Sequence, residues 1–476
     1  MKKLIFYFIM LSFVAACTDK FDEFNTDTKN PSAVTPGSLF AGAERQLADA
    51  MTNSNQNLNI FRLLAQQWTQ TTYIDESNYD LATRNIPQNF WNIIYLDVLK
   101  ALDEAQKLIP DQNPAVVSEA TKKNQNACAE ILIVYAYSTM VKTFGNIPYK
   151  DALDPDKVYP VYDDAAGIYT DLIARLDAAL TAINSGEEGF GSNDILLGGQ
   201  MNHWLIFGNS LKLRMGMELA DVDAGKAKSI VESAASKAIS SNDDNVAFHY
   251  LSAPPNTNPI WVDLVQSGRK DFVAANTLVD VMTGLSDPRI PLFFTQDAQG
   301  GYTGGIYGSN NNYATYSKPS ETITDPSFEA LLLDYSEVEF LKAEAVERGF
   351  AVGGSAEEHY NNGIRASISY WGGSDAQANT YLSDGKVAYS TATGNWKQKI
   401  GTQKWIALYN RGFESWTEIR RLDFPQLQLP SDAVTGYPNR YTYPVQEQNL
   451  NTQNYNQAAS AIGGDKVETK LFWDKF

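Results

Sequence analysis

Cysteine, histidine and positive charge are all scarce in this sequence. The chain has 476 residues but only 2 Cys and 3 His, and 38 basic side chains stand against 56 acidic ones for a formal net charge of −18. Two cysteines cannot build a disulfide framework or a cysteine-rich zinc or iron–sulfur site. The acidic balance argues against nucleic-acid binding, which needs clustered Lys and Arg to contact phosphates.

Short catalytic motifs are missing as well. The histidines at 203, 249 and 359 do not form a zinc-protease pattern, and the chain has no serine elbow, phosphate loop or dinucleotide fingerprint. Residues 221–232 faintly resemble a calcium loop, but the glycine comes one place early, so we expect a helix cap there instead. A glycosidase pair of carboxylates cannot be excluded by counting acids. We therefore predict a non-enzyme without metal or cofactor, and keep a secreted hydrolase as a distant alternative.

The N-terminus is typical of a bacterial lipoprotein. Lys2 and Lys3 precede an apolar run over 4–13 that is too short to span a membrane, and small residues then lead to Cys17. We predict a signal peptide over 1–16 and a tether and arm over 17–37, lipidated at Cys17. No later segment has 18 consecutive apolar residues, so the lipid alone is expected to hold a soluble body at the membrane. Cys128, left without a partner, lies on an apolar helical stripe and is predicted to be a buried thiol.

Helical periodicity dominates the remaining residues, 38–476, which we expect to form a single domain. A strong helix is predicted over 124–143, with stop signals at Gly145 and Pro148, and Asp163 or Asp164 is expected to cap the next helix at 164–184. A second pair, 332–347 with 356–371, has the size of a tetratricopeptide repeat. The fold class is therefore mostly α, with tetratricopeptide-like helix pairs at about 124–184 and 332–371 and a loop-rich remainder. Further helices are expected within 38–110, broken at 74–89, and at 200–220, 226–240, 273–284 and 411–422.

Several blocks, taken in order, resemble the SusD/RagB family of Bacteroidetes outer-membrane lipoproteins, in its SusD-like branch. No single block is decisive, but together with the N-terminal signal they span nearly the whole chain. The blocks lie at 144–153, 204–214, 287–289, 337–345, 403–405, 414–425 and 438–444.

This resemblance implies a helical scaffold and a loop-rich ligand face. It also implies a non-catalytic nutrient receptor that binds oligosaccharides and lies as a lid over a SusC-like, TonB-dependent outer-membrane transporter. The acids at 19, 22 and 23 resemble the export signal of this class and favour the outer face of the outer membrane. Two alternatives stay open, a peptide-capturing receptor of the same family and a purely structural lid. The resemblance leaves the identity of the ligand undetermined.

Two segments combine aromatic faces with polar anchors, as sugar sites require. The first supplies Tyr73, Asn78, Tyr79 and Arg84, and the second is the glycine-rich loop 297–318. Glycines in this loop are expected to let the backbone move or approach a ligand. A mobile solvated loop, or a surface that meets the transporter, is an equal alternative for it, and Trp68 and Trp91 are expected in the core. The candidate ligand-binding residues are Tyr73, Asn78, Tyr79, Arg84, Tyr302, Tyr307 and Tyr313.

Two glutamates of the family-like blocks are expected to serve the fold. Glu337 and Glu344 lie on one predicted helix, and arginines such as Arg420 or Arg421 lie on another. A carboxylate and a guanidinium can pair through two parallel hydrogen bonds, which locks the geometry of both side chains. We therefore predict ion pairs between these two helices rather than a ligand site.

Overall fold

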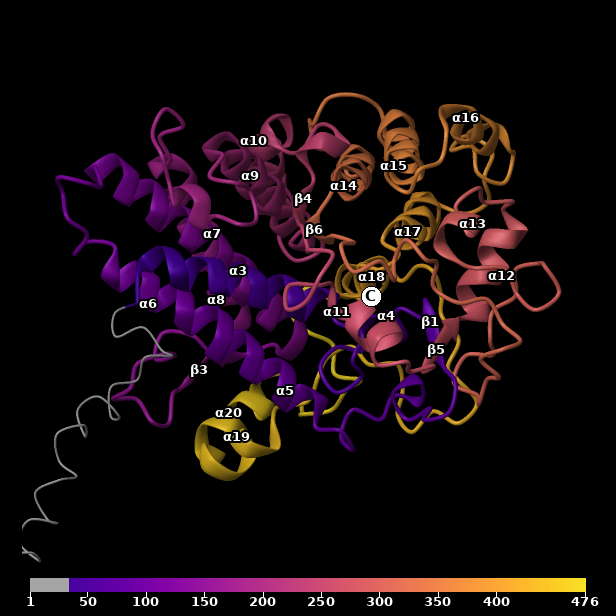
Figure 1. The fold of residues 1–476 in the computed structure, drawn as a ribbon, viewed down its shortest axis with the longest axis horizontal. Coiled ribbons are helices and arrows are strands. Elements are labelled where there is room, and N and C mark those ends of the chain that lie inside the picture. Colours follow the sequence, from indigo (N-terminus) through magenta and orange to yellow (C-terminus); the bar gives the residue numbers. More distant parts are fainter. Residues whose placement is uncertain (1–33) are drawn as a thin grey trace, which may run out of the picture.

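The computed structural model describes residues 34–476, and most of these lie in helices (Figure 1). The predicted signal peptide, Cys17 and the predicted arm as far as residue 33 lie outside the described residues. The first described helix, α3, begins at Pro36, so the last two residues assigned to the arm belong to a helix. Its N-cap is Thr35, whose side chain accepts a hydrogen bond from the backbone of Ser38.

The chain consists of helices of very different length with a few short strands between some of them. The α-helices are α3 (Pro36–Thr52), α4 (Phe61–Leu64), α5 (Ile86–Asn92), α6 (Lys100–Leu108), α7 (Glu119–Phe144), α8 (Ala165–Ala182), α9 (Met201–Glu218), α10 (Ala224–Ala234), α11 (Pro259–Trp261), α12 (Asn276–Gly284), α13 (Ile290–Phe293), α14 (Tyr335–Glu347), α15 (Ala356–Tyr370), α16 (Asp375–Ser383), α17 (Trp396–Ala407), α18 (Gly412–Leu422), α19 (Val445–Leu450) and α20 (Thr452–Ala461). The strands are β1 (Trp68–Gln70), β2 (Ile147–Pro148), β3 (Tyr162–Asp163), β4 (Val246–Phe248), β5 (Phe272–Ala274) and β6 (Ala330–Leu333).

Two helix boundaries, the start of α8 and the end of α7, lie where the sequence predicts them. Asp164 caps α8 by accepting the backbone N–H of Gly167, and Gly145 ends α7 with a φ of 87°, which glycine adopts at little cost. The calcium-like stretch is also a cap, because the side chain of Asp223 accepts the backbone N–H of Lys226 at the start of α10. Asp221 instead forms an ion pair with Arg348.

The helices form successive antiparallel pairs. α7 packs on α8, α9 on α10, α14 on α15 and α17 on α18, while α9 touches both α8 and α14 and so joins neighbouring pairs (Figure 1). The mostly helical, tetratricopeptide-like fold is therefore confirmed, including the two pairs predicted at 124–184 and 332–371. The pair that α17 completes is absent from the prediction.

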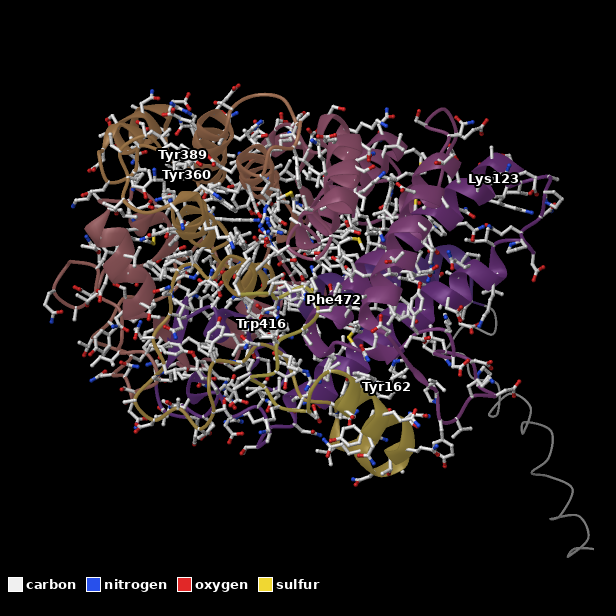
Figure 2. The ribbon with its side chains drawn as sticks, turned by 180° about the vertical axis from the view of Figure 1, so that it is seen from behind. Lys123, Tyr162, Tyr360, Tyr389, Trp416 and Phe472 are labelled. Carbon is white, nitrogen blue, oxygen red and sulfur yellow. The ribbon has the colours of Figure 1, made fainter. Side chains whose placement is uncertain are left out.

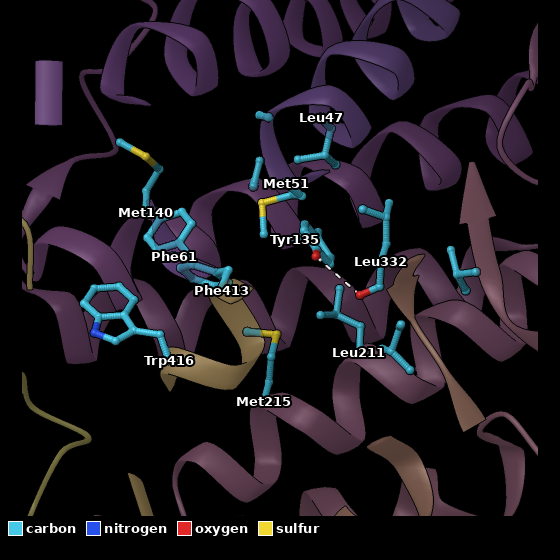
Figure 3. Packing of buried hydrophobic residues seen from close by; sticks show 14 of the residues in the cluster. Leu47, Met51, Phe61, Tyr135, Met140, Leu211, Met215, Leu332, Phe413 and Trp416 are labelled. Carbon is cyan, nitrogen blue, oxygen red and sulfur yellow. Dashed lines mark hydrogen bonds between the residues drawn. The ribbon is translucent and has the colours of Figure 1, made fainter. Parts of the chain in front are cut away.

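The core lies where α7 crosses the other pairs. α7 is long and apolar enough to span a bilayer, yet 94% of its apolar window is buried within the protein. Figure 3 shows Tyr135 of α7 among side chains from α3, α9 and α18, with its hydroxyl donating to the carbonyl of Leu332. Cys128 is buried in the same helix, as predicted, and burial raises the pKa of its thiol. α7 is thus the central helix of the domain.

Buried ion pairs connect the helix pairs across this core. Glu344 of α14 forms a bidentate ion pair with Arg421 of α18, as predicted. Glu337 pairs instead with Arg214 of α9 and with Arg411, because both guanidinium groups reach its carboxylate at 2.6 Å. Arg420 forms no ion pair among the residues described. Its guanidinium lies 3.3 Å from the centre of the Trp416 ring.

Candidate functional site

A short antiparallel pair brings the two predicted site segments together. β1 pairs with β5, with Trp68 opposite Ala274, and the pairing continues as the backbone N–H of Thr71 donates to the carbonyl of Asp271. On the other side of Thr71, its carbonyl accepts the N–H of Asn311 from the loop 297–318. The segment after β1 and the glycine-rich loop therefore lie side by side, although more than 200 residues separate them in sequence.

Three of the seven candidate residues are buried and hold the two segments together. Asn78 donates to the carbonyls of Ile74 and Gly308 at 3.0 and 2.8 Å, and the Tyr307 hydroxyl donates to the carbonyl of Leu63 at 2.7 Å. Tyr79 is 1% exposed, and burial raises the pKa of its phenol to about 12. The Tyr79 hydroxyl accepts a hydrogen bond from Nε2 of Gln66 at 2.9 Å, whereas Oδ1 of Asn78 is buried without a partner among the residues described. The burial of these three side chains and their hydrogen bonds support the fold around the loop.

Arg84 is the partner of a buried acid. Its Nε lies 2.5 Å from Oε1 of Glu76, and Nε2 of Gln70 donates to the other oxygen of that carboxylate at 2.6 Å. Burial raises the pKa of Glu76, which the hydrogen bond from Gln70 and the charge of Arg84 partly offset. Removing Arg84 would leave a buried carboxylate without its counter-charge, so this arginine also supports the fold.

The remaining candidates, Tyr73, Tyr302 and Tyr313, reach the surface. Tyr73 is 62% exposed, so most of its aromatic ring is open to a ligand in the described part of the chain. Tyr313 is half-buried, and burial raises the pKa of its phenol. Tyr302 is half-buried and packs against the edge of the core. We use the term tyrosine face for these three tyrosines, which come from two segments that lie side by side, and for the backbone beside them.

Two lysines lie beside the tyrosine face and are absent from the predicted ligand-binding residues. The ammonium groups of Lys270 and Lys318 lie 5.7 and 5.2 Å from the centre of the Tyr313 ring. Lys270 precedes β5 and Lys318 ends the loop, so only the pairing of β1 with β5 and the path of the loop bring them to one ring. No local motif marks either lysine, and long-range pairing of this kind has no short sequence signal.

Two glycines of the loop are needed for close packing. A Cβ on Gly304 would lie 2.3 Å from the backbone nitrogen of Asn276, and one on Gly308 would lie 2.4 Å from Cβ of Pro430. Gly308 also has a φ of 75°, in the left-handed region. Both glycines allow the loop to lie directly on its neighbours, and the expectation that the loop glycines let the backbone move or approach a ligand stays a prediction.

Clustered metal ligands are not found among residues 34–476. No group of three His, Cys, Asp or Glu side chains in this range is placed to hold a metal ion. Several deeply buried carboxylates, such as Glu337 and Glu344, form ion pairs with arginines. Trp68 and Trp91 lie in the core, 1% and 6% exposed, as the sequence predicts.

Comparison with known proteins places the chain among outer-membrane-associated binding proteins. The profile of the SusD-like family, described as starch-binding and associating with the outer membrane, matches residues 28–444. No curated protein gives a significant match.

Solved structures share the fold over almost the whole chain. A chitin-binding protein superposes with a TM-score of 0.81 at 24% identity, over 93% of this chain and 100% of that one. A SusD homologue from Bacteroides thetaiotaomicron has a TM-score of 0.79 at 25% identity, over 93% and 100%. A chitin-binding SusD homologue from Flavobacterium johnsoniae has a TM-score of 0.76 at 25% identity, over 92% and 97%.

Proposed function

The chain belongs to the SusD-like family, and from this premise we propose that it captures oligosaccharides at the cell surface through the tyrosine face. The observation that carries the proposal is the exposed Tyr73 beside the half-buried Tyr302 and Tyr313, all on backbone held by buried hydrogen bonds. Aromatic rings on a rigid scaffold can stack against sugar rings with little loss of conformational entropy. Two relatives are described as chitin-binding, which supports a glycan ligand.

We further propose that the protein delivers its ligand to a SusC-like, TonB-dependent transporter in the outer membrane. The description of the family, associating with the outer membrane, supports this location. Cys17, which lies outside the described residues, would carry the lipid that holds the protein to the outer face of that membrane. Peptide capture and a purely structural lid are the alternatives, and both are outcomes of the experiments below.

The test of glycan capture uses residues 18–476 without lipid and a calorimetric screen of oligosaccharides and mixed peptides. We expect saturable binding of a sugar, weakened at least tenfold, or about 1.4 kcal/mol, by Tyr73→Ala or Tyr313→Ala with no change in melting temperature. Tyr159→Ala is the matched control, because Tyr159 is 63% exposed but lies near β3. A response to peptides alone would favour the peptide-capturing alternative, and no response to either class would favour the structural lid.

The lipid anchor is tested by fractionating cells that produce Cys17→Ala. We expect the variant to leave the membrane fraction in a strain without the transporter, because the lipid is the proposed anchor. Continued membrane association in that strain would contradict the anchor.

The hydrolase alternative is tested with purified residues 18–476. This protein should leave oligosaccharides uncleaved, and the appearance of shorter products would favour the hydrolase.

A further inference from the structure

We propose that the ligand of the tyrosine face is an acidic glycan, whose carboxylate or sulfate group binds between Lys270 and Lys318 while a sugar ring stacks on the tyrosines. This inference rests on the proposed function and adds the charge class of the ligand. It is carried by the position of the two lysines, which come from separate segments and meet at the ring of Tyr313.

The two lysines have no acidic partner in the described part of the chain. Neither Lys270 nor Lys318 forms an ion pair with a carboxylate of residues 34–476. The ammonium group of Lys318 donates one hydrogen bond to the carbonyl of Tyr316 at 2.9 Å. The neighbouring Arg269 differs, because its Nε lies 2.5 Å from the carboxylate of Asp271. The face therefore keeps two positive charges that the protein itself does not neutralise.

This local surplus is notable because the whole chain is strongly acidic. The formal net charge is −18. Many arginines are also buried in ion pairs of the core, so they add little positive charge to the surface. Charges more than about 10 Å away are largely screened at physiological salt, so the groups near the face decide which ligand it attracts. Asp75 is exposed near Tyr73 but forms no ion pair with either lysine.

The geometry favours an anion over the ring alone as the partner of these lysines. An exposed cation–π contact contributes only about 0.5–1 kcal/mol, so the ring of Tyr313 neutralises neither charge. An anionic group of the ligand beside this ring would supply a counter-charge and accept charge-assisted hydrogen bonds from the lysines. The exposed ring of Tyr73 then offers an apolar face to the neutral part of the same glycan.

The experiment compares oligosaccharides matched in length but different in charge. A neutral oligosaccharide is measured beside its uronate-containing and its sulfated counterparts, with the wild-type chain and with Lys270→Gln/Lys318→Gln. We expect at least tenfold tighter binding of one acidic form by the wild type, which falls as salt rises from 50 to 300 mM. The double variant should lose this preference and keep its affinity for the neutral form.

Matched controls separate a local site from general charge. Lys123→Gln/Lys157→Gln changes the net charge equally at exposed lysines elsewhere, and Figure 2 shows Lys123 at the end of α7. Lys270→Arg/Lys318→Arg should restore the preference. Equal binding of neutral and acidic forms, or a preference that survives in the glutamine variant, would overturn the acidic ligand and leave glycan capture standing. Absence of binding to every glycan would overturn both proposals.

Discussion

Tyrosines of the predicted ligand segments have different roles in this protein, because some are exposed and others are buried. Tyr73 is 62% exposed while Tyr307 is 7% exposed, although both belong to the predicted ligand segments. Their local sequences look equally suitable for a sugar site. The difference arises from the hydrogen bond of Tyr307 to Leu63 and from the contact of its loop with β1, which only the folded chain reveals.

One buried acid should make the protein less stable as pH rises. Glu44 is 1% exposed, and burial followed by the charge of Asp194 raises the pKa of its carboxyl well above the usual value. Its stabilising contribution is therefore complete below the unfolded-state pKa of about 4.3 and is lost as pH rises through the folded-state pKa. Glu44→Gln should flatten the fall in melting temperature between pH 5 and 8, measured by thermal unfolding.

The control for this change is Glu187→Gln, which removes an exposed carboxylate. In the wild type, Oε2 of Glu44 accepts a hydrogen bond from the backbone N–H of Ile195 at 2.8 Å. The amide oxygen of a glutamine can accept the same hydrogen bond. Parallel pH profiles for the wild type and Glu44→Gln would contradict the raised pKa.

A second buried acid should behave in the opposite way. Burial alone would raise the pKa of Glu344, but the charges of Arg421 and Arg348 outweigh it and hold the pKa below its usual value. The contribution of Glu344 is present above the unfolded-state pKa of about 4.3 and is lost as pH falls through the folded-state pKa. Glu344→Gln should lower the free energy of unfolding at pH 7 by about 3 kcal/mol, because the buried Arg421 loses one of its two carboxylate partners and keeps only Glu418.

Denaturant unfolding at pH 7 and at pH 3.5 measures this effect, with Glu187→Gln as the surface control. The loss should shrink by about 1 kcal/mol at the lower pH, because pH 3.5 lies below the unfolded-state pKa of about 4.3 but above the folded-state pKa of about 2, so that only the unfolded chain takes up a proton at Glu344. A loss below about 1 kcal/mol at pH 7 would mean that the ion pair contributes no more than a surface pair.

At the scale of elements, apolar periodicity predicts helices well where one face is buried. α8, α14 and α15 appear close to their expected bounds for this reason. α17 was missed because its buried positions include Lys404, which is 0% exposed and paired with Glu418 of α18. A buried lysine removes the apolar signal at that position, and only its partner on another helix explains it.

The helix pair α9–α10 offers a sharp test of packing. A Cβ on Gly216 would lie 2.8 Å from Cγ2 of Ile230 and 2.9 Å from Cγ2 of Val231, and both side chains are branched and stiff. Gly216→Ala should therefore lower the free energy of unfolding by about 1–3 kcal/mol, despite the better helix propensity of alanine.

The matched control lies in α3, where a Cβ on Gly42 would meet nothing within 4 Å. Gly42→Ala should raise the free energy of unfolding by about 0.5–1 kcal/mol through helix propensity alone. Both variants can be measured by denaturant unfolding. Equal stabilisation by the two alanines would show that α9 and α10 separate without cost.

At the scale of the whole molecule, the end of the chain returns to the centre of the fold. Leu471 lies on Gly145 at the end of α7, and the rings of Phe472 and Tyr169 of α8 are 5.7 Å apart. Figure 2 shows Phe472 and Trp416 in the middle of the view from behind. The family resemblance predicted the helical scaffold, but its blocks end at residue 444, so this closing contact had no sequence signal.

The last six residues should therefore be essential for stability. Arg420 lies between Trp416 and Trp473, 3.3 and 4.7 Å from the two ring centres, and burial lowers its pKa to about 9. A chain ending at Lys470 would lose Trp473 and leave Arg420 open on one side. We expect the free energy of unfolding to fall by about 3–5 kcal/mol, the cost typical of removing a buried tryptophan side chain.

A chain ending at Asp474 is the control, because it loses only the exposed Lys475 and Phe476. Thermal unfolding and limited proteolysis of both truncations would measure the difference. The shorter chain should melt earlier and be cut near α18, whereas the control should match the full chain. If both truncations melted like the full chain, the contact between Trp473 and Arg420 would be a consequence of the fold and not one of its supports, and Arg420 would need only Trp416 and its backbone acceptors to remain buried.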